Sequence, residues 1–121
     1  MTAALAFAQQ SDNSQPSSIG YPSVAAALEA MRAKSGVQVS TQAGWTVIED
    51  RAALTMWSFT PAGHAAHPAA VRRVIVQQDN DIFVRMAVLC EAAKLTCDQL
   101  VAEFEELNKK MREGLLRQRT R

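Results

Sequence analysis

The sequence lacks the short motifs that carry familiar catalytic chemistry. It has no G-x-S-x-G, no H-E-x-x-H, no phosphate-binding P-loop and no glycine-rich dinucleotide turn. These patterns supply a nucleophile, zinc ligands or a phosphate cradle. We therefore expect a chain that is not an enzyme and that carries no cofactor. A small enzyme with a general acid–base pair formed across strands stays open as the alternative.

Long hydrophobic runs are also missing. No apolar stretch reaches the roughly 18 residues that a membrane-spanning helix needs, so no transmembrane segment is expected. The chain has 121 residues, of which 48% are hydrophobic and 21% charged, as in an ordinary globular domain. This length and composition predict one folded domain with its own core.

The formal net charge is only +1, but the basic and acidic residues are unevenly distributed along the chain. Residues 109–121 contain six basic residues and one acid, whereas acids outnumber bases in residues 1–108. The basic segment has no aromatic residues on which bases could stack, so nucleic-acid binding is not expected. We interpret it as a solvated helix end, with contact to anionic lipid headgroups or an acidic partner as the alternative.

The N-terminal residues resemble the end of a signal peptide. Residues 1–8 are apolar or small, and Ala6-Phe7-Ala8 fits the small-x-small pattern of a signal-peptidase site. We expect residues 1–8 to be a signal-peptide remnant and residues 9–20, which are polar, to be a disordered leader. A single domain then covers residues 21–118, and residues 119–121 form a frayed basic tail. The predicted location is the bacterial periplasm, or the cytoplasm if the match is accidental.

The apolar pattern predicts an α+β fold. An apolar face with period 3.6 favours a helix over residues 22–35, which Ser23 caps and Gly36 ends. A second helical stripe follows Thr96, where Thr96 and Gln99 form a capping box. Between the helices, residues rich in β-formers predict an antiparallel meander of four to five strands with both helices packed on one sheet face. The extended segments are 37–39, 45–48, 54–60, 71–78 and 82–89.

Cys90 and Cys97 are the only cysteines. On one continuous helix their Cα atoms would be about 10.5 Å apart, too far for a disulfide. If a strand ends near Cys90 and Cys97 lies in the first turn of the last helix, a bridge is possible. We predict this bridge, because an even cysteine count in an exported protein favours pairing. Two buried free thiols are the alternative.

His64 and His67 are the only histidines and lie in a loop rich in proline and glycine. A three-residue spacing suits two ligands of one metal ion on a helix. Here the pair lies in a loop and no third ligand follows from the sequence. The two histidines are therefore weak candidates for a metal site, and loop histidines that pack or face solvent are the simpler interpretation.

Two tryptophans and two arginines are the remaining weak candidates, for a binding surface. Trp45 and Trp57 lie on predicted strands, where core packing is the usual role and an exposed ring marks a binding face. Arg73 and Arg85 lie on opposite arms of a predicted hairpin and are expected near each other.

The leading functional hypothesis is a non-catalytic exported binding protein. Its sheet face or histidine loop would contact a protein or another component of the cell envelope. One alternative is a metal-handling protein or small enzyme centred on His64 and His67. Another is an interaction module that self-associates through its last helix.

Overall fold

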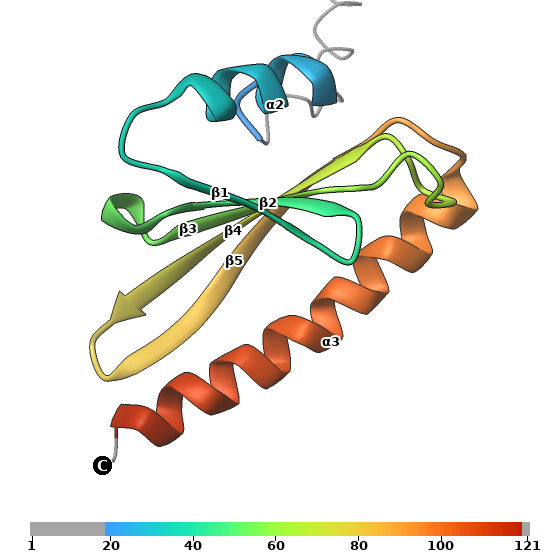
Figure 1. Ribbon diagram of the computed structural model, residues 1–121. Coiled ribbons are helices and arrows are strands. Elements are labelled where there is room, and N and C mark those ends of the chain that lie inside the picture. The colour runs from blue at the N-terminus through green and yellow to red at the C-terminus, as the bar shows by residue number, and fades with distance from the viewer. Residues whose placement is uncertain (1–18, 120–121) are drawn as a thin grey trace, which may run out of the picture.

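The computed structural model describes residues 19–119, and the predicted fold class is confirmed. An N-terminal helix, a five-stranded antiparallel sheet and a long C-terminal helix follow one another along the chain (Figure 1). The expected features in residues 1–18 and 120–121 lie outside the described residues. The elements are α2 (Val24–Ala33), β1 (Gln38–Gln42), β2 (Trp45–Asp50), the 3-10 turn η2 (Arg51–Ala53), β3 (Thr55–Phe59), β4 (Ala69–Gln78), β5 (Asp81–Cys90) and α3 (Lys94–Arg119).

The sheet is a simple meander. Its strands lie in the order β1-β2-β3-β4-β5, and each pairs with its neighbour in sequence in the antiparallel direction. The β1–β2 turn has positive φ at both central residues, 52° at Ala43 and 85° at Gly44. Turns of this type match the twist of the flanking strands, which fixes the register of the hairpin.

The two helices cover opposite faces of the sheet, which corrects the expectation that both pack on one face. Ala70 belongs to the cluster under α2, whereas its neighbours Ala69 and Val71 belong to the cluster under α3. Consecutive strand residues point to opposite faces, so the two clusters lie on different sides. Figure 1 shows α2 on one side of the sheet and α3 on the other.

Helix α2 has the Ser23 cap and the apolar face that its sequence predicts, but it covers Val24–Ala33 instead of residues 22–35 and ends at Lys34, before Gly36. Ser23 is the N-cap, and its Oγ accepts a hydrogen bond from the Ala26 N–H. Ala27 and Met31 pack with Trp57 in one buried cluster. Ile19 is fully buried in the same cluster, so packing begins two residues before the expected domain start at residue 21.

Helix α3 starts earlier than predicted. It begins at Lys94, and the Thr96 hydroxyl donates to the Ala93 carbonyl, so the proposed Thr96 cap is wrong. Leu100 and Phe104 form the buried part of its apolar stripe. Arg119, expected in the frayed tail, is its last residue. Among residues 19–119, no helix combines the length and apolarity needed to cross a bilayer.

An ion pair holds the C-terminal half of α3 against the β4–β5 hairpin. Arg112 Nη2 lies 2.7 Å from Asp81 Oδ1, and Arg112 Nε donates to the Ile82 carbonyl at 2.8 Å. Hydrogen bonds from Arg112 and from the Ile82 N–H lower the pKa of the Asp81 carboxyl below its ordinary 3.8. The contact therefore favours the ionised carboxylate.

Acid is expected to weaken this contact. A carboxyl whose pKa is lower in the folded state stabilises the fold fully above its unfolded pKa, and that contribution is lost as pH falls through the folded pKa. The urea midpoint of Arg112→Gln should therefore fall less than that of the wild type between about pH 6 and about pH 3. Lys109→Gln removes a cation that pairs with Glu106 instead and serves as control. Equal acid sensitivity of wild type and Arg112→Gln would contradict the assignment.

Candidate functional site

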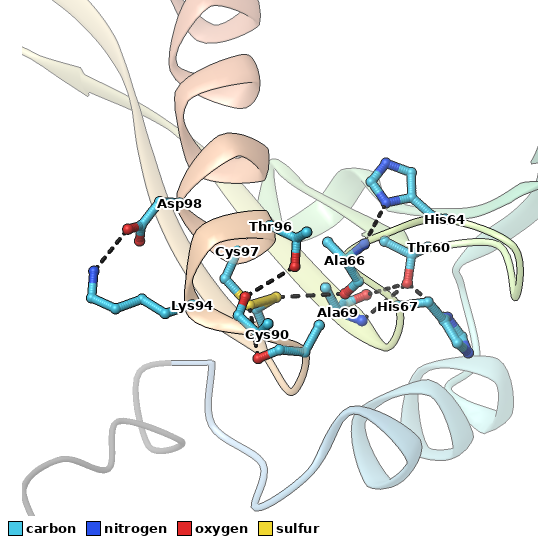
Figure 2. Close-up of a disulfide and its surroundings, with 12 residues drawn as sticks. Thr60, His64, Ala66, His67, Ala69, Cys90, Lys94, Thr96, Cys97 and Asp98 are labelled. Atoms are coloured by element: carbon cyan, nitrogen blue, oxygen red, sulfur yellow. Dashed lines mark hydrogen bonds and ion pairs between the residues drawn. A yellow bond between two sulfur atoms is a disulfide. The ribbon is translucent and has the colours of Figure 1, made fainter.

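The histidine loop between β3 and β4 is held by internal hydrogen bonds. His67 Nδ1 lies 2.9 Å from the Thr60 hydroxyl, and His64 Nδ1 accepts the Ala66 N–H at 2.9 Å. The Thr60 hydroxyl also accepts the Ala69 N–H at 3.0 Å. In Figure 2 the two imidazole rings point away from each other. Both Nδ1 atoms are thus engaged in hydrogen bonds that hold the loop.

The structure brings no third ligand to this pair. Within residues 19–119, no three side chains of histidine, cysteine, aspartate or glutamate are grouped as a metal site would require. His64 packs instead against Trp45 in an edge-to-face arrangement, with ring centroids 5.2 Å apart. The geometry of this loop therefore favours a structural role.

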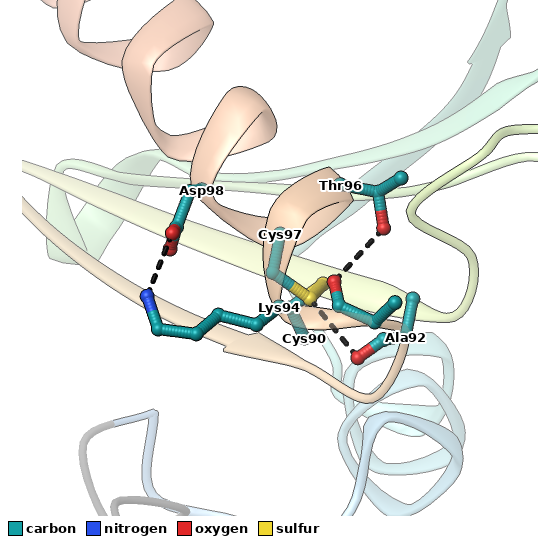
Figure 3. Close-up of polar contacts among 7 residues, drawn as sticks. Cys90, Ala92, Lys94, Thr96, Cys97 and Asp98 are labelled. Carbon is teal, nitrogen blue, oxygen red and sulfur yellow. Dashed lines mark hydrogen bonds and ion pairs between the residues drawn. A yellow bond between two sulfur atoms is a disulfide. The ribbon is translucent and has the colours of Figure 1, made fainter.

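The disulfide lies at the junction of β5 and α3. Cys90 ends β5, Cys97 lies in the first turn of α3, and the two sulfur atoms are bonded with a Cα–Cα distance of 5.8 Å. The predicted bridge is therefore confirmed. Figure 3 shows the same turn with an ion pair from Lys94 to Asp98, at 2.7 Å. The bridge fixes the direction in which α3 leaves the sheet.

Neither tryptophan offers an exposed binding platform. Trp57 is 4% exposed and lies under α2, where it stacks on Phe59 with ring centroids 5.8 Å apart. Trp45 is half-buried on the other face, between His64 and Phe104. The interpretation of both residues as core is supported by these contacts.

Arg73 and Arg85 do not come together, although both lie on the β4–β5 hairpin. Arg73 pairs across the strands with Met86, and Arg85 pairs with Val74. Because Met86 and Arg85 are consecutive, the two arginines point to opposite faces. Arg85 is exposed and lies over the Phe83 ring, whereas Arg73 points toward α3.

Arg73 is a buried cation without an anionic partner. Its side chain lies over the Phe104 ring, 5.0 Å from the centroid, and the residue is only 8% exposed. Its Nη atoms reach the Met56 Sδ at 3.2 Å and the Asn108 Oδ1 at 3.5 Å, and its Nε has no hydrogen-bond partner among the described residues. Burial lowers the pKa of the guanidinium. None of the ion pairs within residues 19–119 involves it.

Arg73 lines a groove between α3 and the sheet. The groove has a volume of about 300 Å³, and its wall is mainly apolar. Strand pairing places Glu49, Met56 and Arg73 in one row across β2, β3 and β4. The lining residues are Glu49, Arg51, Leu54, Thr55, Met56, Arg73, Ile75 and Met111.

Arg73 was among the residues that the sequence singled out, but the groove around it was not predicted. Arg73 interrupts the apolar residues of β4 that face α3, namely Ala69, Val71 and Ile75. A charge at such a position is the one local signal of an unusual site. Met111 belongs to the groove only because α3 crosses this face.

Comparison of the chain with family models, with curated proteins and with solved structures returned no match. A functional assignment for this protein therefore rests on the geometry and chemistry of its own residues.

Loss of the disulfide is expected to destabilise the protein. The chain-entropy model gives about 2–3 kcal/mol for closing so short a loop. The double variant Cys90→Ala, Cys97→Ala should lower the free energy of unfolding by this amount in urea titrations. Reduced wild type is the matched control and should unfold at the same midpoint as the double variant. A double variant as stable as the oxidised wild type would contradict the prediction.

Proposed function

We propose that this chain is a non-catalytic binding protein whose groove between α3 and the sheet receives the apolar part of a small organic molecule. The observation that carries the proposal is the apolar groove with a buried, unpaired arginine in its wall. The groove replaces the histidine loop as the candidate site, because both histidine Nδ1 atoms already bond within that loop.

The rim of the groove is fixed by backbone contacts. Leu54 has a φ of 53°, its N–H donates to the Arg51 carbonyl, and its own carbonyl accepts the Ile75 N–H at 2.9 Å. Leu54 itself is 51% exposed. Each Å² of apolar surface that a ligand removes from water contributes about 25 cal/mol of favourable free energy. A preformed apolar rim of this kind favours ligand binding because little ordering is needed.

The chemistry of the wall favours a small molecule over a peptide. β3 and β4 pair with each other through Met56 and Arg73, so their backbone groups are committed to the sheet. A peptide in the groove would bury its own N–H and C=O groups without partners, which is costly. The volume of about 300 Å³ lies at the lower end of the range for small-molecule pockets.

Export to the bacterial periplasm is part of the proposal. The Cys90–Cys97 disulfide supports an oxidising compartment, because such bridges are rare where thiols are kept reduced. The Ala6-Phe7-Ala8 pattern supports removal of a leader.

Protein recovered from its native cells is expected to begin at Gln9. Intact mass measurement after alkylation should show the loss of residues 1–8 and no labelled thiol. A control sample reduced before alkylation should gain two labels. An intact N-terminus together with two labelled cysteines in the unreduced sample would contradict export.

Filling the groove is expected to abolish ligand binding. The neutral probe n-octanol should shift the amide resonances of Met56, Ile75 and Met111 in a saturable way in NMR spectra. Ile75→Trp occupies the groove and should remove this response. Val74→Trp is the matched control, because Val74 is the neighbouring half-buried residue on the opposite face.

Two results would contradict the proposed function. The first is the absence of any saturable octanol response in the wild type. The second is a response that persists unchanged in a folded Ile75→Trp variant, because the probe would then bind elsewhere.

A further inference from the structure

We infer that the ligand of the groove carries a single carboxylate, which pairs with Arg73, on an aliphatic chain. This inference rests on the proposed function, because it concerns the same groove. The inference extends the proposed function by naming the chemical class of the ligand, which is a medium-chain aliphatic carboxylate.

The Arg73 guanidinium is buried beside the groove without a countercharge. The residue is more than nine-tenths buried and lines the groove, and its Nε has no partner among the described residues. A buried charge is costly unless it is paired and hydrogen-bonded. The contacts that Arg73 does make do not supply a countercharge, so an anionic ligand would complete the site.

The available acceptors are weak. A thioether sulfur accepts hydrogen bonds poorly, so Met56 gives Arg73 little compensation. Asn108 Oδ1, at 3.5 Å, is at the outer limit of a hydrogen bond. Asn108 is itself held by a contact from its Nδ2 to the Met86 Sδ at 3.3 Å. A carboxylate offers the guanidinium two parallel charge-assisted bonds, which are much stronger than either contact.

The charges around the groove favour a monoanion. Glu49 lies in the same cross-strand row as Arg73, two strands away, or about 10 Å between Cα atoms at the usual strand spacing. Arg51 pairs with Glu49 at 3.4 Å and is turned toward this carboxylate at the rim. Arg73 is therefore the one cation in the wall that has no salt-bridge partner among the described residues, and a dianion such as a phosphate monoester would meet repulsion from Glu49 without a second unpaired cation.

The groove volume suits a ligand with a medium-length chain. About 300 Å³ is the space of about ten water molecules at roughly 30 Å³ each. Octanoate, with about ten non-hydrogen atoms, fits this space on that measure. Its chain would contact Ile75 and Met111 while its carboxylate reaches Arg73. Octanol has the same chain without the charge and is the matched probe.

The test compares the two probes by isothermal titration calorimetry at neutral pH. Octanoate is expected to bind the wild type roughly ten- to hundredfold more tightly than octanol, as one charge-assisted interaction allows. Arg73→Met keeps an unbranched apolar stem at this position and removes the guanidinium and its charge. It should lower octanoate affinity by the same factor and leave octanol affinity unchanged. Arg85→Met, which changes an exposed residue on the opposite face of the sheet, should change neither.

The outcomes separate the two proposals. If octanol binds the groove but octanoate binds no better, or if folded Arg73→Met retains full octanoate affinity, the carboxylate inference is wrong and the binding function stands. If neither probe binds, the proposed function fails. Arg73→Met is expected to stay folded, with a melting temperature equal to or above that of the wild type, because it removes an unpaired buried charge.

An NMR titration of carboxyl-labelled octanoate measures the pKa of the bound carboxyl, which apolar packing alone would not lower. Beside Arg73 the pKa of the bound carboxyl should fall below that of free octanoate, because a nearby cation favours the ionised form. In Arg73→Met the apolar wall should instead raise the pKa of any bound carboxyl. A raised pKa in the wild type would overturn the inference.

Removal of the Glu49 carboxylate from the groove wall tests the charge preference of the site. Glu49→Gln removes the repulsion between Glu49 and the bound anion and should tighten octanoate binding by roughly twofold, with octanol unchanged. If Glu49 were instead the partner of Arg73 in solution, Glu49→Gln would enhance octanoate binding far more strongly and would lower the melting temperature. That result would show that the site is internally paired and would overturn the inference.

Discussion

Side chains along β4 point alternately to the two faces of the sheet, and each face is covered by a different helix. Ala70 contributes to the cluster under α2, whereas Ala69 and Val71 contribute to the cluster under α3. The sheet therefore has two apolar faces, and neither helix can be removed without exposing one of them. This constraint also places Arg73, two residues after Val71, on the face that α3 covers.

Burial of Arg73 is the chemical consequence of that placement. The residue lies at the point where the α3 cluster ends at Phe104 and the groove begins at Met56 and Ile75. Contact with the Phe104 ring compensates part of the desolvation of the guanidinium, because the face of an aromatic ring attracts a cation. The Met56 and Asn108 contacts supply no countercharge, and this is the basis on which we propose an anionic ligand.

The position of α3 connects the disulfide to the groove. The bridge between Cys90 and Cys97 fixes the start of the helix beside the end of β5, and the Arg112–Asp81 pair holds its second half against the hairpin. Between these two contacts, Leu100 and Phe104 pack on the sheet and Met111 reaches the groove. The one part of the groove wall that α3 supplies, Met111, therefore belongs to a helix that is attached to the sheet near its start and again in its second half, so the groove is preformed.

The sequence by itself determined the local elements of this protein. Apolar periodicities, turn residues and the Ser23 cap are signals between neighbours in the chain, and they predicted both helices, the meander and a strand end compatible with the Cys90–Cys97 bridge. Only the tertiary structure decided which helix covers which face, and it separated Arg73 from Arg85. A strand pattern states that alternate residues share a face but not what covers that face. The groove depends on strand register and on the path of α3, which bring Glu49, Arg73 and Met111 together from distant parts of the chain.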